Sequence, residues 1–133
     1  MERVSLKTSR RKEWVDITDL LGEAVARLDL SAGAALVFVP HTTAGVTVNE
    51  GADPAVAEDL EGVLCRLVPA AGPYRHAEGN SDAHAQTLLA GPSLLLPVEG
   101  GRVRLGTWQR VFFCEFDGPR AREVWVQALP LRE

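Results

Sequence analysis

The sequence contains few of the residues that build covalent or metal-rich scaffolds. Its 133 residues include two cysteines, three histidines and one methionine. Cys65 and Cys114 form no C-x-x-C pair, and both lie in apolar stretches, where free cysteine usually behaves as a small buried hydrophobe. A chain of this length buries enough surface to fold without disulfides. We therefore expect a reduced, cytoplasmic protein.

Long apolar runs and an excess of positive charge are also absent. The longest apolar run, AGAALVFVP (32–40), is too short to span a membrane, and residues 1–20 carry charges throughout and lack a secretory apolar segment. The net charge of −4 opposes a broad nucleic-acid surface, and the short basic cluster SRRK (9–12) is interpreted as a solvated turn. Neither a membrane nor a nucleic acid is expected as a partner.

The residue pattern predicts a single α+β domain over residues 1–133, because no linker or repeat interrupts it and strands alternate with helices of unequal length. Apolar residues at helical spacing predict helices over 20–28, 54–67 and about 83–90. Alternating and β-branched runs predict strands over 3–9, 13–17, 35–39 and 44–50, and an antiparallel meander with glycine turns in the C-terminal third.

Local signals suggest how these elements begin and end. Asp53 followed by Pro54 is a typical helix start, and Asp82 is expected to cap the third helix, which Gly91 terminates. Trp108 is expected in the core, with stacking on a ligand ring as the alternative. Glu115 alternates with apolar residues and therefore needs a buried partner or an interface.

The three histidines, His41, His76 and His84, all lie at element ends or in loops, where functional groups concentrate. Three neutral imidazoles with an open fourth position would suit a catalytic Zn²⁺. Their spacing matches no established motif, so a hydrogen-bonded structural role remains the alternative for each. His84 is also placed in the first turn of a helix, where free backbone N–H groups favour an anion.

Three further segments carry candidate phosphate ligands. In PHTTAGVTVNEGADP, the hydroxyls of Thr42 and Thr43 could donate to a phosphate, while Asn49 and Glu50 end a strand from which side chains can reach a site. In GNSDAH, a turn at Gly79-Asn80 accounts for the asparagine. In DGPR, Asp117 is explained by the turn, whereas the planar fork of Arg120 could grip a phosphate.

Taken together, the segments HTTAGVTVNEGADP, EGNSDAH, GPSLLLPV and GRVRLGTWQRVFFCEFDGPR resemble the YjbQ family, whose members are described as secondary thiamine-phosphate synthases. The resemblance covers nearly the whole chain. It implies a compact α+β fold with a β-sandwich core, a homotrimer, and a weak ability to join hydroxymethylpyrimidine diphosphate to thiazole phosphate with release of pyrophosphate. Ser81 stands where relatives commonly carry alanine.

The family's site positions fall on residues already singled out, with one addition, Cys114. The expected metal ligands are His41, His76 and His84; the expected catalytic residues are Glu50, Asp53 and Arg120; the expected substrate or phosphate ligands are Thr42, Thr43, Asn49, Asn80, Asp117 and Arg120. The metal is expected to be divalent: imidazoles favour zinc, whereas diphosphate chemistry commonly uses magnesium. A metal-dependent hydrolase and a non-catalytic trimeric binder of a phosphorylated metabolite are the alternative functions.

Overall fold

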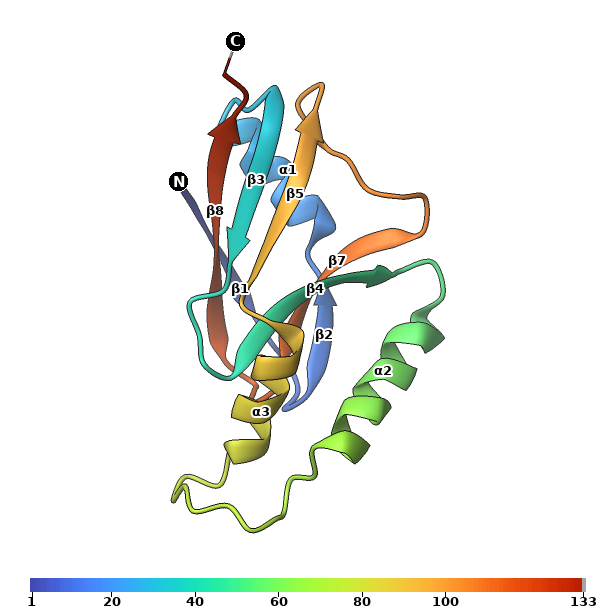
Figure 1. Ribbon diagram of the computed structural model, residues 1–133, viewed down its shortest axis with the longest axis vertical. Coiled ribbons are helices and arrows are strands. Elements are labelled where there is room, and N and C mark those ends of the chain that lie inside the picture. Colours follow the sequence, from blue (N-terminus) through green and yellow to red (C-terminus); the bar gives the residue numbers. More distant parts are fainter. Residues whose placement is uncertain (133) are drawn as a thin grey trace.

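The computed structural model describes residues 1–132, which form three helices and eight strands (Figure 1). In chain order they are β1 (Glu2–Lys7), β2 (Glu13–Asp16), α1 (Thr18–Arg27), β3 (Ala32–Phe38), β4 (Ala44–Glu50), α2 (Pro54–Leu67), α3 (Ser81–Ala90), β5 (Ser93–Glu99), β6 (Arg102–Val103), β7 (Gln109–Glu115) and β8 (Ala121–Pro130). None of the helices within residues 1–132 is long and apolar enough to cross a membrane.

The strands form two antiparallel sheets, so the predicted α+β class is confirmed. The larger sheet has the order β1-β8-β3-β5-β6, and the smaller has the order β2-β7-β4. The predicted C-terminal meander is wrong, because only β5 and β6 form a hairpin. Strand β7 instead joins β2 and β4, and β8 returns to the larger sheet between β1 and β3. Local turn signals could not reveal this change of sheet.

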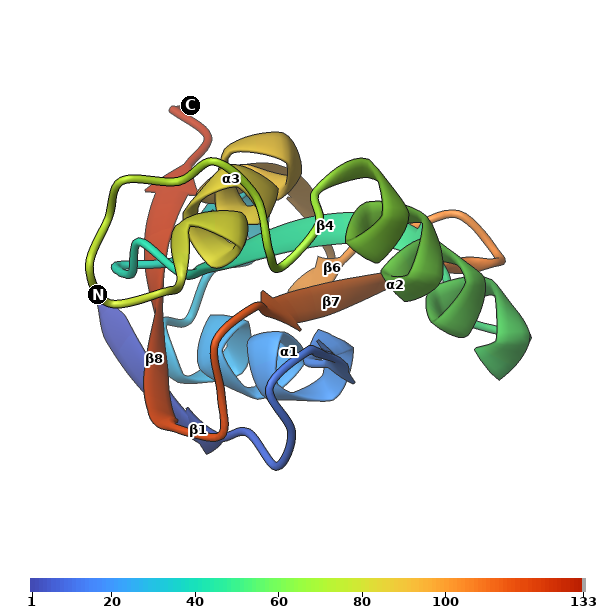
Figure 2. The same ribbon diagram turned by 90° about the horizontal axis from the view of Figure 1, so that it is seen from below.

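The main core lies between the larger sheet, the smaller sheet and α1 (Figure 2). Strand alternation turns Val37 and Val126 of the larger sheet inward, and Phe113 of β7 meets them from the smaller sheet. Helix α1 adds Leu21 and Val25 to the same cluster and contacts both sheets. Burial of these side chains supplies the main driving force for the fold.

The other face of β7 builds a second, smaller core. Phe112, Cys114 and Phe116 are buried there against Ala83 of α3 and Leu64 of α2. The expected division of β7 into two faces is therefore confirmed, as is the burial of Cys114. The same expectation is wrong for Cys65, which is exposed on α2, and Trp108 is not in the core because 65% of it is exposed.

The start of α2 and the end of α3 follow the predicted local chemistry, whereas the start of α3 does not. The Asp53 carboxylate accepts a hydrogen bond from the Ala55 N–H at 2.9 Å and caps α2 as predicted. At α3 the capping position belongs to Asn80, so the predicted cap at Asp82 is wrong. Asp82 lies inside the first turn, where its carboxylate accepts hydrogen bonds from Arg11 and Lys12. Gly91 ends α3 with φ of 91°, as expected for a glycine cap.

On its outward face, the larger sheet carries apolar side chains that are exposed or only partly buried. They alternate with the core residues of β3, β5 and β8: Phe38, Leu95 and Leu129 are exposed, and Leu36 and Trp125 are partly exposed. Phe38 and Trp125 pack together with ring centroids 5.9 Å apart. We call these five residues the outer apolar face.

Candidate functional site

An open groove lies where the β3–β4 connection passes the start of β8. Its volume is about 500 Å³, and its lining includes Phe38, His41, Thr42, Thr43, Arg120 and Arg122. We call it the His41 groove. It brings together four predicted site residues, His41, Thr42, Thr43 and Arg120, which come from two segments far apart in the sequence. Pro40 and Ala44 bound the loop that presents the two threonines, because β3 has ended and β4 begins.

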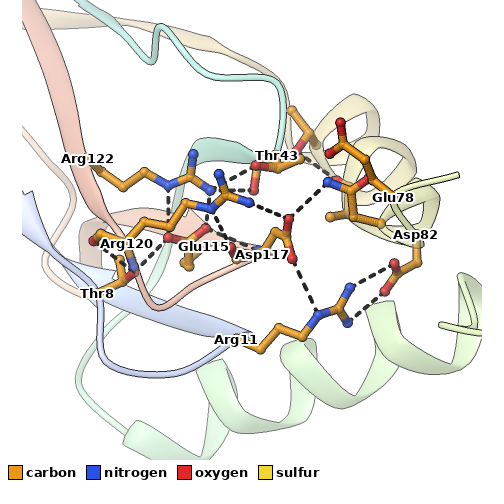
Figure 3. Close-up of polar contacts among 12 residues, drawn as sticks. Thr8, Arg11, Thr43, Glu78, Asp82, Glu115, Asp117, Arg120 and Arg122 are labelled. Atoms are coloured by element: carbon orange, nitrogen blue, oxygen red, sulfur yellow. Dashed lines mark hydrogen bonds and ion pairs between the residues drawn. The ribbon is translucent and has the colours of Figure 1, made fainter. Parts of the chain in front are cut away.

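A buried ion pair forms the floor beneath Thr43. Arg122 of β8 donates through Nε to Glu115 Oε1 at 2.8 Å and through Nη2 to Glu115 Oε2, and both side chains are almost completely buried. Thr8 adds a 2.7 Å bond to the same carboxylate (Figure 3). Burial alone would raise the pKa of Glu115, but the bonds from Arg122 and Thr8 outweigh it and lower the pKa. The partner expected for Glu115 is therefore Arg122.

The ion pair also orients a threonine of the groove. Nη2 of Arg122 donates to Thr43 Oγ1 at 2.9 Å and to the Thr43 carbonyl oxygen at 3.2 Å. Because the hydroxyl accepts from a guanidinium, its own hydrogen is free to bond another acceptor. Thr43 is thus held as a hydrogen-bond donor at the groove wall, the orientation that a phosphate ligand would need.

Arg120 stands at the groove beside a carboxylate. Its Nη2 lies 2.7 Å from Asp117 Oδ2, and its Nε donates to the Asp117 carbonyl oxygen, also at 2.7 Å. Asn80 donates to the same carboxylate oxygen at 3.0 Å. Burial opposes ionisation of Asp117, but the Asn80 bond and the charges of Arg120 and Arg11 lower its pKa. The Arg120 side chain is about half exposed, so it can exchange this partner for a ligand.

The polar network continues to α3 through residues that the sequence analysis missed. Arg11 spans from Asp117 to Asp82, which it binds through two nitrogens at 3.0 and 3.1 Å (Figure 3). Lys12 also binds the Asp82 carboxylate, at 2.8 Å. Burial opposes ionisation of Asp82, yet these cations lower its pKa to about 2. The SRRK cluster does form the bend between β1 and β2 with Ser9 and Arg10 exposed, but Arg11 and Lys12 are partly buried against Asp82. Its contact with an acid seventy residues away leaves no signal in local sequence.

His41 is fixed in one tautomer. Its Nε2 accepts a hydrogen bond from the Glu123 backbone N–H at 3.0 Å, so the neutral ring carries its hydrogen on Nδ1. Burial and the nearby charge of Arg122 lower its pKa. His41 is thus a neutral donor at neutral pH. Its Nε2 lone pair is already used, and this does not fit a metal ligand at that nitrogen.

The three histidines do not form one ligand group within the chain. The rings of His76 and His84 lie edge to face with centroids 5.6 Å apart, next to Glu78, whose carboxylate is 3.9 Å from His76 Nε2. Among residues 1–132, no set of three or more His, Cys, Asp or Glu side chains is placed to hold a metal ion. Within one chain His41 is not grouped with the pair at α3, so the three-histidine metal site stays a prediction.

Two predicted catalytic residues, Glu50 and Asp53, lie at the opposite end of β4 from Thr43. Six residue steps along a strand correspond to about 20 Å. Glu50 accepts the Asp53 N–H at 3.1 Å, and Asp53 caps α2, so local structure accounts for both carboxylates. Asn49 lies on the same distal end and lines a separate small groove between α2 and α3. Within one chain these three residues therefore lie outside the His41 groove, and their catalytic or binding roles stay predictions.

Asn80 lies behind the groove rather than in it. The residue is only 7% exposed, and its Nδ2 is committed to Asp117. The remaining oxygen, Oδ1, has no hydrogen-bond partner among residues 1–132. Asn80 and Asp117 are therefore placed to position Arg120, whereas Thr42 is exposed and directly reaches the groove.

Comparisons with known proteins identify relatives along almost the whole chain. Residues 2–130 match the family model described as UPF0047 protein YjbQ-like. A UPF0047 protein of Methanocaldococcus jannaschii is 45% identical over 127 residues, covering 96% of this chain and 92% of its own. The UPF0047 protein YugU of Bacillus subtilis is 41% identical over 130 residues, covering 97% and 98%.

Solved structures show the same fold. A YjbQ/UPF0047 family protein of Clostridium acetobutylicum superimposes with a TM-score of 0.93 at 48% identity, covering 96% of this chain and 98% of that one. A conserved hypothetical protein of Thermus thermophilus gives a TM-score of 0.91 at 51% identity, covering 97% and 100%.

Proposed function

Because the chain belongs to the YjbQ-like UPF0047 family, we propose that it binds a phosphorylated small molecule in the His41 groove and acts as a secondary thiamine-phosphate synthase. In this reaction, hydroxymethylpyrimidine diphosphate is joined to thiazole phosphate. The bond between carbon and the diphosphate oxygen breaks, and pyrophosphate leaves with the electron pair. The role of the protein is to hold the diphosphate and to stabilise the charge that collects on it.

The observation that carries this proposal is the set of hydrogen-bond donors around the His41 groove. Arg120 supplies a positive charge, Thr42 and Thr43 supply hydroxyls, and the neutral His41 ring supplies the hydrogen on Nδ1. Glu115, which shares the Arg122 guanidinium with Thr43, is neutralised by that arginine. A groove of about 500 Å³ with this lining suits the charge and size of a diphosphate ester.

Arg120 has the most direct part in the proposed reaction. Its exposed ion pair with Asp117 is worth only about 0–1 kcal/mol, so replacing the carboxylate by a phosphate oxygen costs little. A hydrogen-bond donor to the negative charge that develops on a leaving group typically lowers the activation barrier by roughly 3 kcal/mol. No step is assigned to a metal, since Nε2 of His41 is occupied and the three histidines do not converge within one chain.

Pyrophosphate binding tests the groove independently of turnover. We expect calorimetry to show that Arg120→Ala weakens pyrophosphate affinity about 10- to 100-fold, the loss of one charge-assisted hydrogen bond. Arg120→Lys should restore part of it. The matched control is Arg102→Ala, which removes an exposed arginine from β6, far from the groove in the sheet order. Equal affinity in Arg120→Ala and wild type would rule out the His41 groove as the anion site.

Turnover is then measured as pyrophosphate release with both thiamine precursors. The synthase proposal requires release that depends on both precursors and falls in Arg120→Ala but not in Arg102→Ala. Binding that is sensitive to Arg120 without any turnover would instead favour the non-catalytic binder. Hydrolysis of simple phosphate esters that requires an added divalent metal would favour the hydrolase.

We also propose that the outer apolar face joins subunits of the homotrimer implied by the family. Phe38, Leu95 and Leu129 are 39%, 64% and 45% exposed on one side of a single sheet, an arrangement typical of interaction sites. Sedimentation at micromolar concentration should give a trimer, and Leu95→Glu should shift it towards monomer. A wild-type protein that sediments only as a monomer would contradict this assignment.

A further inference from the structure

We infer that the chain carries a second anion-binding subsite on the other side of His41, in a groove at the end of β1 and the start of β8. The ligand class is a second small molecule that carries a phosphate group. Only the joint role of the two ligands in a reaction rests on the proposed function, because binding of an anion at this groove can be measured by itself. We call it the Lys7 groove.

The Lys7 groove is as large as the His41 groove and shares part of its wall. Its volume is about 510 Å³, and its lining includes Ser5, Lys7, His41, Ala121, Arg122 and Glu123. His41 and Arg122 line both grooves. Since the Glu123 N–H holds the imidazole and the Glu115 carboxylate holds the guanidinium, these two side chains form a fixed partition.

The charges of the Lys7 groove favour an anion. Lys7 is exposed and forms no ion pair within 4.0 Å among residues 1–132, so its ammonium is free to bind a ligand. Ser5 lies two residues away, so strand alternation puts it on the same side of β1 as Lys7. Its exposed hydroxyl is a second possible donor.

The lining of the Lys7 groove contains one carboxylate, that of Glu123, and it hydrogen-bonds to Trp125. Glu123 Oε1 accepts a hydrogen bond from Trp125 Nε1 at 3.0 Å, and Arg3 stacks over the same indole with its guanidinium carbon 5.3 Å from the ring centroid. Arg3 therefore places a further positive charge near Glu123. Within the lining, the unpaired charge of Lys7 faces only the Glu123 carboxylate, which is partly committed to Trp125, and Arg3 adds positive charge beside that indole, outside the lining.

The partition formed by His41 and Arg122 would bring two bound ligands next to each other. An anion held by Lys7 and Ser5 and a second anion held by Arg120 and Thr42 would occupy neighbouring cavities separated by His41. The two charged groups can then be anchored at separate ends while the reacting parts of both molecules meet at the partition. Bringing two reactants together in this way removes translational and rotational entropy from the reaction step.

Inorganic phosphate is the probe, followed by amide chemical shifts of the full-length protein. We expect two sets of shifts, one at Ser5, Lys7 and Glu123 and the other at Thr42 and Thr43. Lys7→Gln should weaken phosphate binding at the first set about tenfold and leave the second set unchanged, as expected for one lost charge-assisted contact. Arg120→Ala should do the reverse. Arg102→Gln removes the same charge from β6 and serves as the control for general attraction.

Each outcome separates this inference from the proposed function. Shifts confined to Thr42 and Thr43 would overturn the second subsite and leave the His41 groove intact. Shifts confined to the Lys7 groove would support the subsite and count against the proposed function. An effect of Arg102→Gln equal to that of Lys7→Gln would overturn the subsite, because it would reduce the binding to surface charge. Lys7 is exposed, so circular dichroism should show an unchanged fold in its variant.

Discussion

The carboxylate of Asp82 offers the most quantitative test of the polar network. Asp82 is 1% exposed and is bound by Arg11 and Lys12, so its ionised form is stabilised in the folded state. Its pKa falls from 3.8 to about 2. Each unit of difference between the folded-state and unfolded-state pKa corresponds to about 1.4 kcal/mol, which gives roughly 2 kcal/mol of stability at neutral pH.

The direction of the pH dependence follows from the lowered pKa. The contribution is complete above the unfolded-state pKa near 3.8 and is lost as the pH falls towards about 2. By the same relation, about half of the contribution remains at pH 3 and only a small part at pH 2. The gap in unfolding free energy between wild type and Asp82→Asn should therefore close over this range.

Urea unfolding of wild type and Asp82→Asn at pH 7 and at pH 3 measures this gap. At pH 7 the variant should be about 2 kcal/mol less stable, which corresponds to a Tm lower by roughly 7–9 °C for a chain of this length. Protein concentration is held constant because assembly would also affect the midpoint. Asp59→Asn, at an exposed position of α2, is the matched control and should change stability little. A gap that is the same at both pH values would refute the electrostatic explanation.

Three further predictions concern the core, the backbone and His41. Glu115→Gln should lower the free energy of unfolding by about 3–5 kcal/mol, because it leaves Arg122 buried without its counter-charge, and Glu115→Leu combined with Arg122→Met should recover a large part of the loss in the same urea assay. A Cβ added at Gly22, in the middle of α1, meets nothing within 4 Å, so Gly22→Ala should raise the free energy of unfolding by about 0.5–1 kcal/mol. Gly33→Ala should clearly lower it, because Gly33 has φ of 137° and an added Cβ would lie 2.8 Å from the Leu131 nitrogen. Equal effects of the two substitutions would contradict the backbone argument. The pKa of His41 is lowered, so its titration followed by nitrogen NMR should have a midpoint below 6.5, with the hydrogen on Nδ1 at pH 7. The stability that depends on the neutral form of the ring should be lost as the pH falls below about 6.5. A midpoint above 6.5 would contradict this.

Local sequence was sufficient for the elements whose signals are short-range. The Asp53-Pro54 start of α2, the glycine end of α3 and the full extent of β4 follow from capping chemistry and residue alternation. Alternation also identified both faces of β7 and showed that Glu115 needed a partner. The polar segments PHTTAG and DGPR pointed to His41, Thr42, Thr43 and Arg120, which do line one groove.

Only the tertiary structure decided which distant residues meet. The crossing of β7 and β8 into different sheets brings Arg122 onto Glu115 and Thr43, and the return of the N-terminal segment brings Arg11 and Lys12 onto Asp82. The same packing leaves Glu50 and Asp53 at the far end of β4. Sequence spacing records what neighbours do within a few residues. The packing of two sheets fixes contacts between residues seventy or more positions apart, and no local pattern contains that information.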